Sequence, residues 1–354
     1  MAILTGASKA RERREALAGI ADGSIDLLIG THALIEDRVQ FSNLGFVVID
    51  EQHRFGVEQR ARLWTKNEQP PHILVMTATP IPRTLAMTLY GDLDVSVIDE
   101  LPPGRQPIRT VHYTDAARLR LFGFMRQEIK KGRQIYVVYP LIKESETMDY
   151  KDLQDGYEAI SRDFPLPEYV TTICHGKMKP EDKEESMRQF KSGEANIMVA
   201  TSVIEVGVDV PNATVMVIES AERFGLSQLH QLRGRVGRGS EQSYCILMSG
   251  EKLSKEARLR LEAMCETNDG FRLAELDLKL RGAGDVNGTL QSGMAFDLKI
   301  ANPTLDSQIL TVTREAAAEV LTADPTLTQN GHEGLRELRK RYSGREEIDF
   351  SQIS

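Results

Sequence analysis

Short apolar runs alternate with helix-like segments along the first hundred residues of the chain. Continuous apolar runs of this kind are typical of strands buried on both faces of a parallel sheet. Between the first two runs, the apolar residues of Ser8–Ala21 recur at helical spacing, and Gly23 ends that helix. The pattern predicts an α/β lobe with strands at Ala2–Leu4, Leu27–Gly30, Phe46–Ile49 and Ile73–Met76.

A proline-rich stretch then interrupts the pattern. Glu100–Pro107 contains three prolines and a glycine, which break both helix and strand, so we place an interdomain linker there. From about residue 108 the alternation starts again, with predicted helices at Ala116–Ile129 and Pro180–Gly193. The predicted strands of this second α/β lobe are Ile135–Ile142, Tyr169–Cys174, Ile197–Ala200, Val215–Ile218 and Tyr244–Met248.

Beyond Gly250 the pattern becomes helical. Lys255–Thr267 and Phe271–Leu280 predict two helices joined by a turn, which make a helical hairpin. Two further helix-like segments occupy Gln308–Leu321 and Gly334–Arg341. We therefore divide the chain into a first lobe at 1–104, a second lobe at 105–250, and the hairpin with a C-terminal tail at 251–354.

Composition excludes several classes of protein. A chain of 354 residues with 41% hydrophobic and 27% charged residues can bury a large core. No window approaches about eighteen continuous apolar residues, so we expect no transmembrane helix and no membrane partner. The net charge of −8 argues against a basic coat for nucleic acid but permits a local basic channel. The three widely spaced cysteines indicate free thiols in a reducing compartment and offer no zinc site.

Polar side chains follow three of the strand-like runs in the first lobe. They are Thr31 with His32, Asp50 to His53, and Thr77 to Thr79. Because ligands bind at the carboxyl ends of strands in doubly wound sheets, we expect these polar tips to share one edge. Each also has a plainer explanation, as a tight exit from a strand, an acidic loop or a structural histidine.

The carboxylates of Asp50 and Glu51 are the clearest catalytic candidates. One carboxylate at a strand end can position Mg²⁺, and its neighbour can orient or deprotonate an attacking water. Mg²⁺ keeps several waters and needs only one or two carboxylates besides phosphates, so no larger ligand cluster is required. In the second lobe, Thr201, Glu205–Asp209, and His175 with Gly176 are the corresponding polar tips.

Gln231–Gly239 interleaves three arginines with three glycines. Glycine lets a backbone approach a phosphate closely, and the arginine fork binds phosphate oxygens in a bidentate manner. Arginines presented to a transferring phosphoryl group stabilise the charge of the transition state in many NTPases. The alternative is a solvated basic loop.

These motifs are similar to those of superfamily 2 helicases. Asp50–His53, Thr77–Thr79, Ala200–Asp209 and Gln231–Arg238 stand in the order of helicase motifs II, III, V and VI. The sequences that flank these motifs resemble those of the RecG family, with the transcription-repair coupling translocases as nearest relatives. Gln52 favours the RecG family, because the coupling factors usually carry glutamate there.

The resemblance implies two RecA-like parallel-sheet lobes, the first of them truncated, followed by the hairpin and C-terminal helices. Asp269–Asp285 with Gln291–Gly293 is similar to the translocation hairpin that both groups share. The implied cofactors are ATP and Mg²⁺, and the implied partner is branched or double-stranded DNA, such as a stalled fork or a Holliday junction. The implied location is the bacterial cytoplasm, in association with the nucleoid.

The resemblance also implies a role for each matching residue. Catalysis would use Asp50, which would hold Mg²⁺, together with Glu51, Gln52, His53, Arg235 and Arg238. Nucleotide binding would use Gln231, Gly207 and Asp209. Coupling of hydrolysis to movement would use Thr77, Ala78, Thr79, Arg281 and Gln291. Contact with the DNA backbone would use Thr31, His32, His175, Gly176 and Thr201.

The sequence departs from the helicase pattern in one respect. It contains no Gly-x-x-x-x-Gly-Lys-Ser/Thr stretch, the loop that cradles nucleotide phosphates, and no preceding wedge domain. We therefore expect the C-terminal part of a RecG-type enzyme, inactive as an ATPase without its N-terminal part. Residues 1–99 should expose an apolar face or sheet edge that invites self-association.

Two other functions stay open on the sequence alone. The chain could be a non-catalytic fragment that binds DNA or a partner protein through its second lobe and hairpin. It could also belong to a transcription-repair coupling translocase, which would require a domain that binds RNA polymerase.

Overall fold

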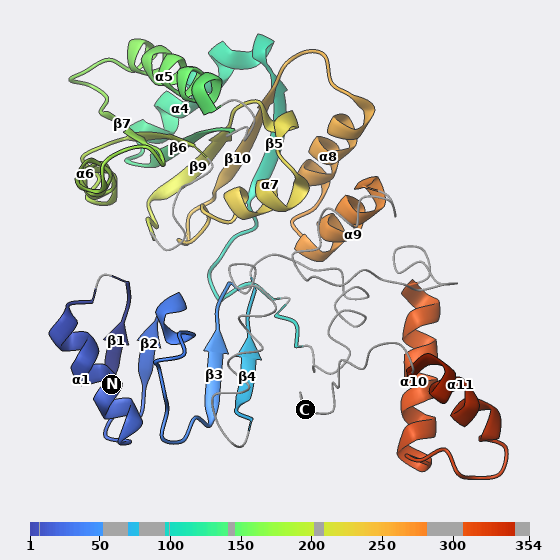
Figure 1. Ribbon diagram of the computed structural model, residues 1–354. Coiled ribbons are helices and arrows are strands. Elements are labelled where there is room, and N and C mark those ends of the chain that lie inside the picture. Colours follow the sequence, from blue (N-terminus) through green and yellow to red (C-terminus); the bar gives the residue numbers. More distant parts are fainter. Residues whose placement is uncertain are drawn as a thin grey trace. The chain divides into compact units, whose positions relative to one another are not determined.

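The computed structural model describes residues 1–6, 8–51, 70–77, 96–98, 100–140, 146–201, 209–281 and 307–343. It divides into two compact units (Figure 1). The first unit contains Met1–Thr79, Arg83–Val95 and Arg281–Ser354, and the second contains Pro80–Pro82 and Ser96–Leu280. Among the described residues, no helix is long and apolar enough to cross a membrane.

The first unit contains two parallel strand pairs. β1 (Ala2–Leu4) pairs with β2 (Leu28–Gly30), and β3 (Phe46–Ile49) pairs with β4 (His72–Val75). The helix α1 (Ala10–Ala21) and the short 3₁₀ helix η1 (His32–Leu34) accompany the first pair. A small core joins them through Leu4, Ile20, Ala33 and Val39.

The strands of the first unit are buried on one face only. Ile3, Phe46 and Val48 expose 61%, 60% and 51% of their surfaces, whereas Leu4 and Ile49 are buried. The prediction of burial on both faces is therefore wrong for these strands, and the expected apolar surface is confirmed. The reason is the alternation of side chains across a strand, which leaves every second apolar residue uncovered when one face lacks a packing layer.

The second unit is built on a six-stranded sheet in the order β5-β10-β9-β6-β8-β7, with every neighbouring pair parallel. Its strands are β5 (Arg109–Thr114), β6 (Gln134–Tyr139), β7 (Thr171–Cys174), β8 (Ile197–Thr201), β9 (Ala213–Ile218) and β10 (Tyr244–Ser249). Because all strands run the same way, their carboxyl ends form one edge of the sheet and their amino ends form the other.

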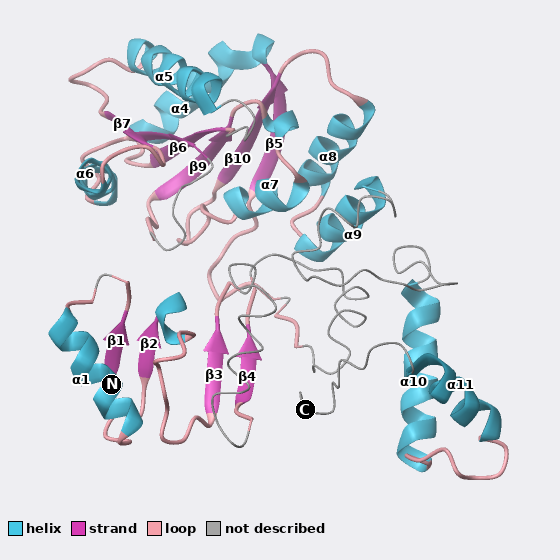
Figure 2. Ribbon diagram, in the orientation of Figure 1, coloured by secondary structure: helices cyan, strands magenta, loops and turns pink. Residues whose placement is uncertain are grey.

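Helices cover both faces of this sheet (Figure 2). One face packs against α4 (Arg118–Lys130) and α5 (Glu146–Asp163). The other face packs against α6 (Pro180–Lys191), α7 (Leu226–Arg233), α8 (Lys255–Glu266) and α9 (Gly270–Arg281). The 3₁₀ helices η3 (Asp115–Ala117) and η4 (Ala221–Arg223) lie in the connections.

Burial in the second unit agrees with the apolar runs of its sequence. Every residue of β8 and β9 is buried, as predicted for strands covered on both faces. The apolar pattern of the sequence does not predict β5 or α5. β5 is an edge strand whose residues are mostly half-buried and include polar side chains, so it has no continuous apolar run.

Local sequence signals explain several helix ends. The Ser254 hydroxyl accepts a hydrogen bond of 3.1 Å from the Ala257 amide and so caps α8. Asp269 accepts one of 2.8 Å from the Phe271 amide at the start of α9. Pro180 begins α6, and Gly193 follows that helix at a φ of 82°, where glycine avoids the strain of a left-handed backbone.

Two helices, α10 (Ser307–Ala323) and α11 (Glu333–Ser343), form the tail. The Asp324 carboxylate lies between them and is 4% exposed. It accepts hydrogen bonds from the Gln329 amide at 2.8 Å and from His332 Nδ1 at 2.9 Å. These contacts, with the Gln329 amide contributing most, hold the pKa of Asp324 well below its usual range.

Candidate functional site

The two carboxylates of the first unit stand directly after β3. The Asp50 side chain is exposed and accepts a hydrogen bond of 2.8 Å from the Glu51 amide. Glu51 has a φ of 51°, in the left-handed region that costs a non-glycine residue energy and that clusters at functional sites. The neighbouring strand β4 ends beside them, because the Met76 amide donates to the Ile49 carbonyl at 2.7 Å. The exposed Thr77 therefore follows on the same edge.

The donor atoms on this edge suit a hard divalent cation. Carboxylate and hydroxyl oxygens are the ligands that Mg²⁺ prefers, and one or two carboxylates suffice when phosphates and waters complete the shell. Asp50 is open to solvent, so a hydrated ion can reach it without displacing packed side chains. The residues present therefore fit a Mg²⁺ site of the nucleotide-dependent kind.

Only two of the three predicted polar tips lie next to each other in the first unit. The ends of β3 and β4 are adjacent, whereas Thr31 follows β2 in the other strand pair and its amide donates to the Leu4 carbonyl at 3.4 Å. His32 begins η1. The predicted site residues that lie outside the described part of the chain are Gln52, His53, Ala78, Thr79, Gly207 and Gln291.

The arginine-glycine loop, Gly234–Gly239, follows α7 in the second unit. Its first turn continues the helix, since the Gly234 amide donates to the His230 carbonyl at 3.0 Å. Val236 is 2% exposed and anchors the loop in the core. Gly237 has a φ of 77°, and a Cβ there would lie 2.9 Å from Cγ1 of Ile108. Glycine is therefore required by both backbone conformation and space.

The loop brings predicted nucleotide-binding residues together. Nη1 of Arg238 donates to Oδ1 of Asp209 at 3.4 Å, and both side chains are partly open to solvent. Burial raises the pKa of Tyr136 to about 12, and the positive charges of Arg238 and Arg235 oppose that rise. Gln231 is half-buried on α7, one turn before Arg235.

This cluster lies at the amino edge of the sheet. Asp209 precedes β9, Gly239 precedes β10, and Tyr136 stands early in β6. Thr201 and His175, by contrast, stand at the carboxyl ends of β8 and β7. The five residues of β8 separate the two edges by about 16 Å at roughly 3.3 Å per residue. The second lobe thus has two separate candidate sites, a distinction that the sequence did not reveal.

The carboxyl-edge candidates differ in accessibility. Thr201 is 2% exposed, His175 is 8% exposed, and Gly176 is open to solvent. Burial, followed by the charge of Lys177, lowers the pKa of His175, so its ring is neutral at neutral pH. The Lys177 amide donates to His175 Nδ1 at 3.3 Å, which fixes the ring beside the exposed Gly176 backbone.

A cavity of about 380 Å³, which no sequence motif predicts, also opens at the carboxyl edge. Arg118 lines it and donates to both carboxylate oxygens of Glu219, at 2.8 and 2.9 Å. Gly156 lines it, and a Cβ there would lie 2.4 Å from the Tyr139 hydroxyl. Ser220 is held at a φ of 47°. The only sign of this site in the sequence is the change from the apolar Ile218 to the polar pair Glu219 and Ser220.

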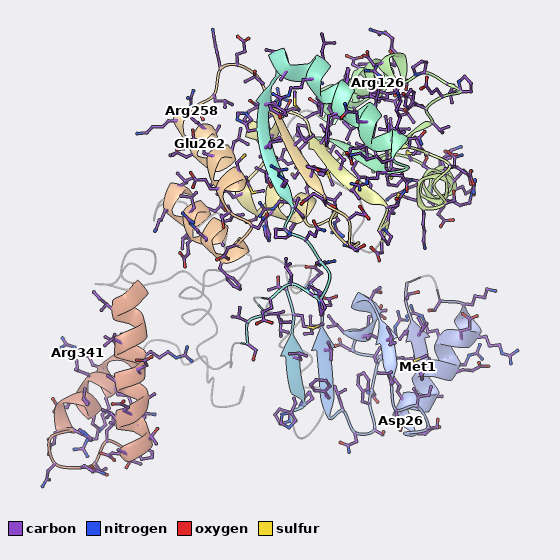
Figure 3. The ribbon with its side chains drawn as sticks, turned by 180° about the vertical axis from the view of Figure 1, so that it is seen from behind. Met1, Asp26, Arg126, Arg258, Glu262 and Arg341 are labelled. Carbon is purple, nitrogen blue, oxygen red and sulfur yellow. The ribbon has the colours of Figure 1, made fainter. Side chains whose placement is uncertain are left out.

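The helical hairpin attaches to the arginine-bearing face of the second unit. Leu261 and Leu273 enter the core from α8 and α9, whereas Arg258 and Glu262 project outward from α8 (Figure 3). Nη2 of Arg260 donates to the Glu222 carbonyl at 3.0 Å. Arg281, the predicted coupling residue, is the last residue of α9.

Comparison with known proteins shows that both sites lie in segments similar to helicases. The DEAD/DEAH box helicase model matches residues 1–88, and the helicase conserved C-terminal domain matches residues 118–240. A third model, ATP-dependent DNA helicase RecG, domain 3, C-terminal, matches residues 267–354. The first two matches contain the carboxylate pair and the arginine-glycine loop.

Curated relatives extend over almost the whole chain. The ATP-dependent DNA helicase RecG of Synechocystis is 52% identical over 341 residues, which are 96% of this chain and 40% of that protein. Along almost its whole length the chain is similar to RecG helicases. The RecG helicase of Bacillus subtilis is 50% identical over 92% of the chain, and that of Escherichia coli K12 is 48% identical over 96%. The chain spans 47% and 49% of their lengths, so it corresponds to less than half of each relative.

Solved structures agree with this assignment. RecG bound to a three-way DNA junction matches 87% of this chain with a TM-score of 0.65 and 44% identity, and the chain covers 39% of it. The helicase MrfA bound to DNA and AMPPNP matches with a TM-score of 0.54 at 16% identity, which shows the fold alone. The RecG resemblance and the α/β fold predicted from the motifs are both confirmed.

Proposed function

We propose that this chain is the C-terminal motor portion of an ATP-dependent helicase that translocates on double-stranded DNA and remodels branched DNA in recombination and repair. The observation that carries the proposal is the loop geometry at the amino edge of the second unit. A buried Val236 and a left-handed Gly237 fix the loop that carries Arg235 and Arg238, and Arg238 contacts Asp209. The names of the RecG relatives and the junction bound to the RecG structure support DNA as the partner.

ATP with Mg²⁺ is the proposed cofactor, and bound Mg²⁺ would neutralise phosphate charge. Asp50 would hold the ion, Glu51 would orient and deprotonate the attacking water, and Gln52 and His53 beside them would couple hydrolysis to lobe movement. Arg235 and Arg238 would stabilise the phosphoryl group in the transition state, because the rigid arginine fork meets phosphate oxygens directly. The proposed nucleotide contacts are Gln231, Gly207 and Asp209.

The remaining roles divide between movement and DNA. Coupling is proposed for Thr77, Ala78, Thr79, Arg281 and Gln291. DNA contact is proposed for the carboxyl-edge group of Thr31, His32, His175, Gly176 and Thr201. The buried hydroxyl of Thr201 makes the exposed Gly176 backbone the more accessible contact in the second unit. We retain 1–104, 105–250 and 251–354 as functional segments, although the hairpin packs on the second lobe.

The sequence of this chain lacks a phosphate-binding loop, so we propose that it has no ATPase activity on its own. We define the joined protein as this chain linked to a RecG N-terminal part that supplies that loop. Such a protein would work in the bacterial cytoplasm, where nucleoid DNA is available. The apolar strands of the first unit would self-associate when that part is absent.

Phosphate release in the presence of branched DNA tests the proposal. The joined protein should show DNA-stimulated turnover, the chain alone should show none, and Asp50→Asn in the joined protein should abolish turnover. Robust turnover by the chain alone would refute its proposed inactivity. A joined protein that binds branched DNA but releases no phosphate would instead support a non-catalytic binding function.

A further inference from the structure

Arg233 differs from the two other arginines of the motif. It is the last residue of α7, and only 2% of its surface is exposed, whereas Arg235 and Arg238 are half-buried at the protein surface. Among the described residues, no carboxylate lies within ion-pair distance of its guanidinium group. A buried charge without a carboxylate needs other compensation, because desolvation of an ion is costly.

Backbone carbonyls supply that compensation. Nη1 of Arg233 donates to the carbonyl of Met264 at 3.0 Å and to that of Thr267 at 2.8 Å. A longer contact of 3.4 Å reaches the Thr110 hydroxyl on β5. Met264 and Thr267 stand at the C-terminal end of α8, where carbonyls lack helical partners and the helix dipole is negative. The end of α8 therefore serves as the counter-charge of Arg233.

The second nitrogen of the fork binds a histidine of its own helix. Nη2 of Arg233 lies 3.0 Å from Nδ1 of His230, and since arginine has no acceptor, Nδ1 accepts and the ring proton is on Nε2. Burial, followed by the charge of Arg233, lowers the pKa of His230 to about 4, although Asp269 opposes the shift. The ring is therefore neutral at neutral pH, as this hydrogen bond requires.

We propose that Arg233 is a positioning residue that joins the arginine-glycine loop to the α8–α9 hairpin, so that Arg235 and Arg238 are set by the position of the end of α8. The arginine-glycine loop begins directly after Arg233, and the Val236 amide within the loop donates to the Arg233 carbonyl at 3.3 Å. This inference rests on the proposed function, because it assigns Arg233 an effect that Arg235 and Arg238 exert on phosphate.

Lysine cannot replace this arginine. The guanidinium group reaches the end of α8 with one nitrogen and His230 with the other, whereas an ammonium is a single point on a flexible stem. Arg233→Lys thus keeps the charge but loses one side of the bridge. The variant isolates positioning from electrostatics.

Arg126 offers a matched control on the opposite face of the sheet. It projects from α4, and its Nη2 donates to the Asp163 carbonyl at the C-terminal end of α5, at 2.8 Å (Figure 3). Its guanidinium group also lies 4.8 Å from the centre of the Phe164 ring. Arg126→Lys thus removes the same kind of contact to a helix end, away from the arginine-glycine loop.

The test measures kcat and KM for ATP in the joined protein with branched DNA. Misplacing a catalytic group by about 1 Å costs about 100-fold in rate, so Arg233→Lys should lower kcat roughly 10- to 100-fold and change KM for ATP little. Arg126→Lys should leave kcat within about two-fold of the parent, since it does not touch the catalytic loop. Arg233→Lys combined with Arg235→Ala should lose less than the product of the two single losses, because part of the effect of Arg233 is exerted through Arg235.

A second readout does not depend on activity. Amide hydrogen exchange in this chain should increase at 234–239 and at the end of α8 in Arg233→Lys, and should not increase there in Arg126→Lys. Full kcat in Arg233→Lys, an equal loss in Arg126→Lys, or additive loss in the double variant would each overturn the inference. Full activity of Arg235→Ala would instead overturn the proposed function, which separates the two failures.

Discussion

Gly237 allows the geometry of the arginine-glycine loop to be tested through stability alone. Gly237→Ala forces alanine into a left-handed conformation, at a φ of 77°, and places its Cβ 2.9 Å from Cγ1 and 3.1 Å from Cδ1 of Ile108. Gly132 has nearly the same φ of 80° but no neighbouring atom within 4 Å of its virtual Cβ. Gly132→Ala therefore reports the backbone cost alone, and Gly237→Ala reports that cost plus the steric contact.

The magnitudes follow from these two costs. A left-handed conformation costs a non-glycine residue about 1–2 kcal/mol. Overpacking of a well-filled site adds about 1–3 kcal/mol. Gly237→Ala should thus destabilise the second unit by about 2 kcal/mol more than Gly132→Ala does. For a unit of this size, that difference corresponds to about 4–8 °C in Tm.

Thermal unfolding of the chain, followed by far-ultraviolet circular dichroism, measures the difference. Ile108→Ala combined with Gly237→Ala should recover the steric part and leave the backbone part, and Ile108→Ala alone completes the cycle. Equal Tm values for Gly237→Ala and Gly132→Ala would show that Ile108 does not contact the loop as described. No recovery in the double variant would refute the same point.

Three further predictions concern charge and pH. Arg235→Ala should lower kcat of the joined protein by about 1,000-fold or more, as loss of an arginine finger does, in a phosphate-release assay. The pKa of His230 is lower in the folded than in the unfolded chain, so the unfolded chain binds a proton first as pH falls. The second unit should therefore lose stability as pH falls from 6.5 towards 4. His230→Asn, which keeps an acceptor but cannot titrate, should reduce that slope in thermal unfolding. The pKa of Asp324 lies well below its ordinary value of 3.8, so its stabilising contacts persist above that pH and are lost in acid. Asp324→Asn should abolish that acid-dependent loss of helicity from α10 and α11.

Each of these expectations has a contrary result. Unchanged kcat in Arg235→Ala would remove the arginine from the transition state. An identical pH slope in His230→Asn would assign the acid sensitivity to another group. The helicity of the Asp324→Asn chain is compared with that of the parent as pH falls. An equal loss of helicity in both would show that the charge of Asp324 does not strengthen its hydrogen bonds from the Gln329 amide and the His332 ring.

Local chemistry explains why much of the fold was predictable. The run Ile197–Thr201 is buried along its whole length, and Pro180 with Gly193 marks the ends of α6. Residues adjacent in sequence, such as Asp50 and Glu51, are necessarily adjacent in the site. β5 was missed because an edge strand needs no continuous apolar run.

The sequence by itself determined the resemblance to RecG helicases, because Asp50–His53 and Gln231–Arg238 form motifs of contiguous residues. Tertiary structure alone decided that the proposed nucleotide-binding residues Asp209 and Arg238 lie together at the amino edge of the second sheet, since they meet only after β9 and β10 are paired. It also decided that Arg233 turns inward. Leu226, Leu229 and Arg233 share one helical face, a spacing that hints at burial, but only packing against α8 provides carbonyls that make a buried arginine tolerable.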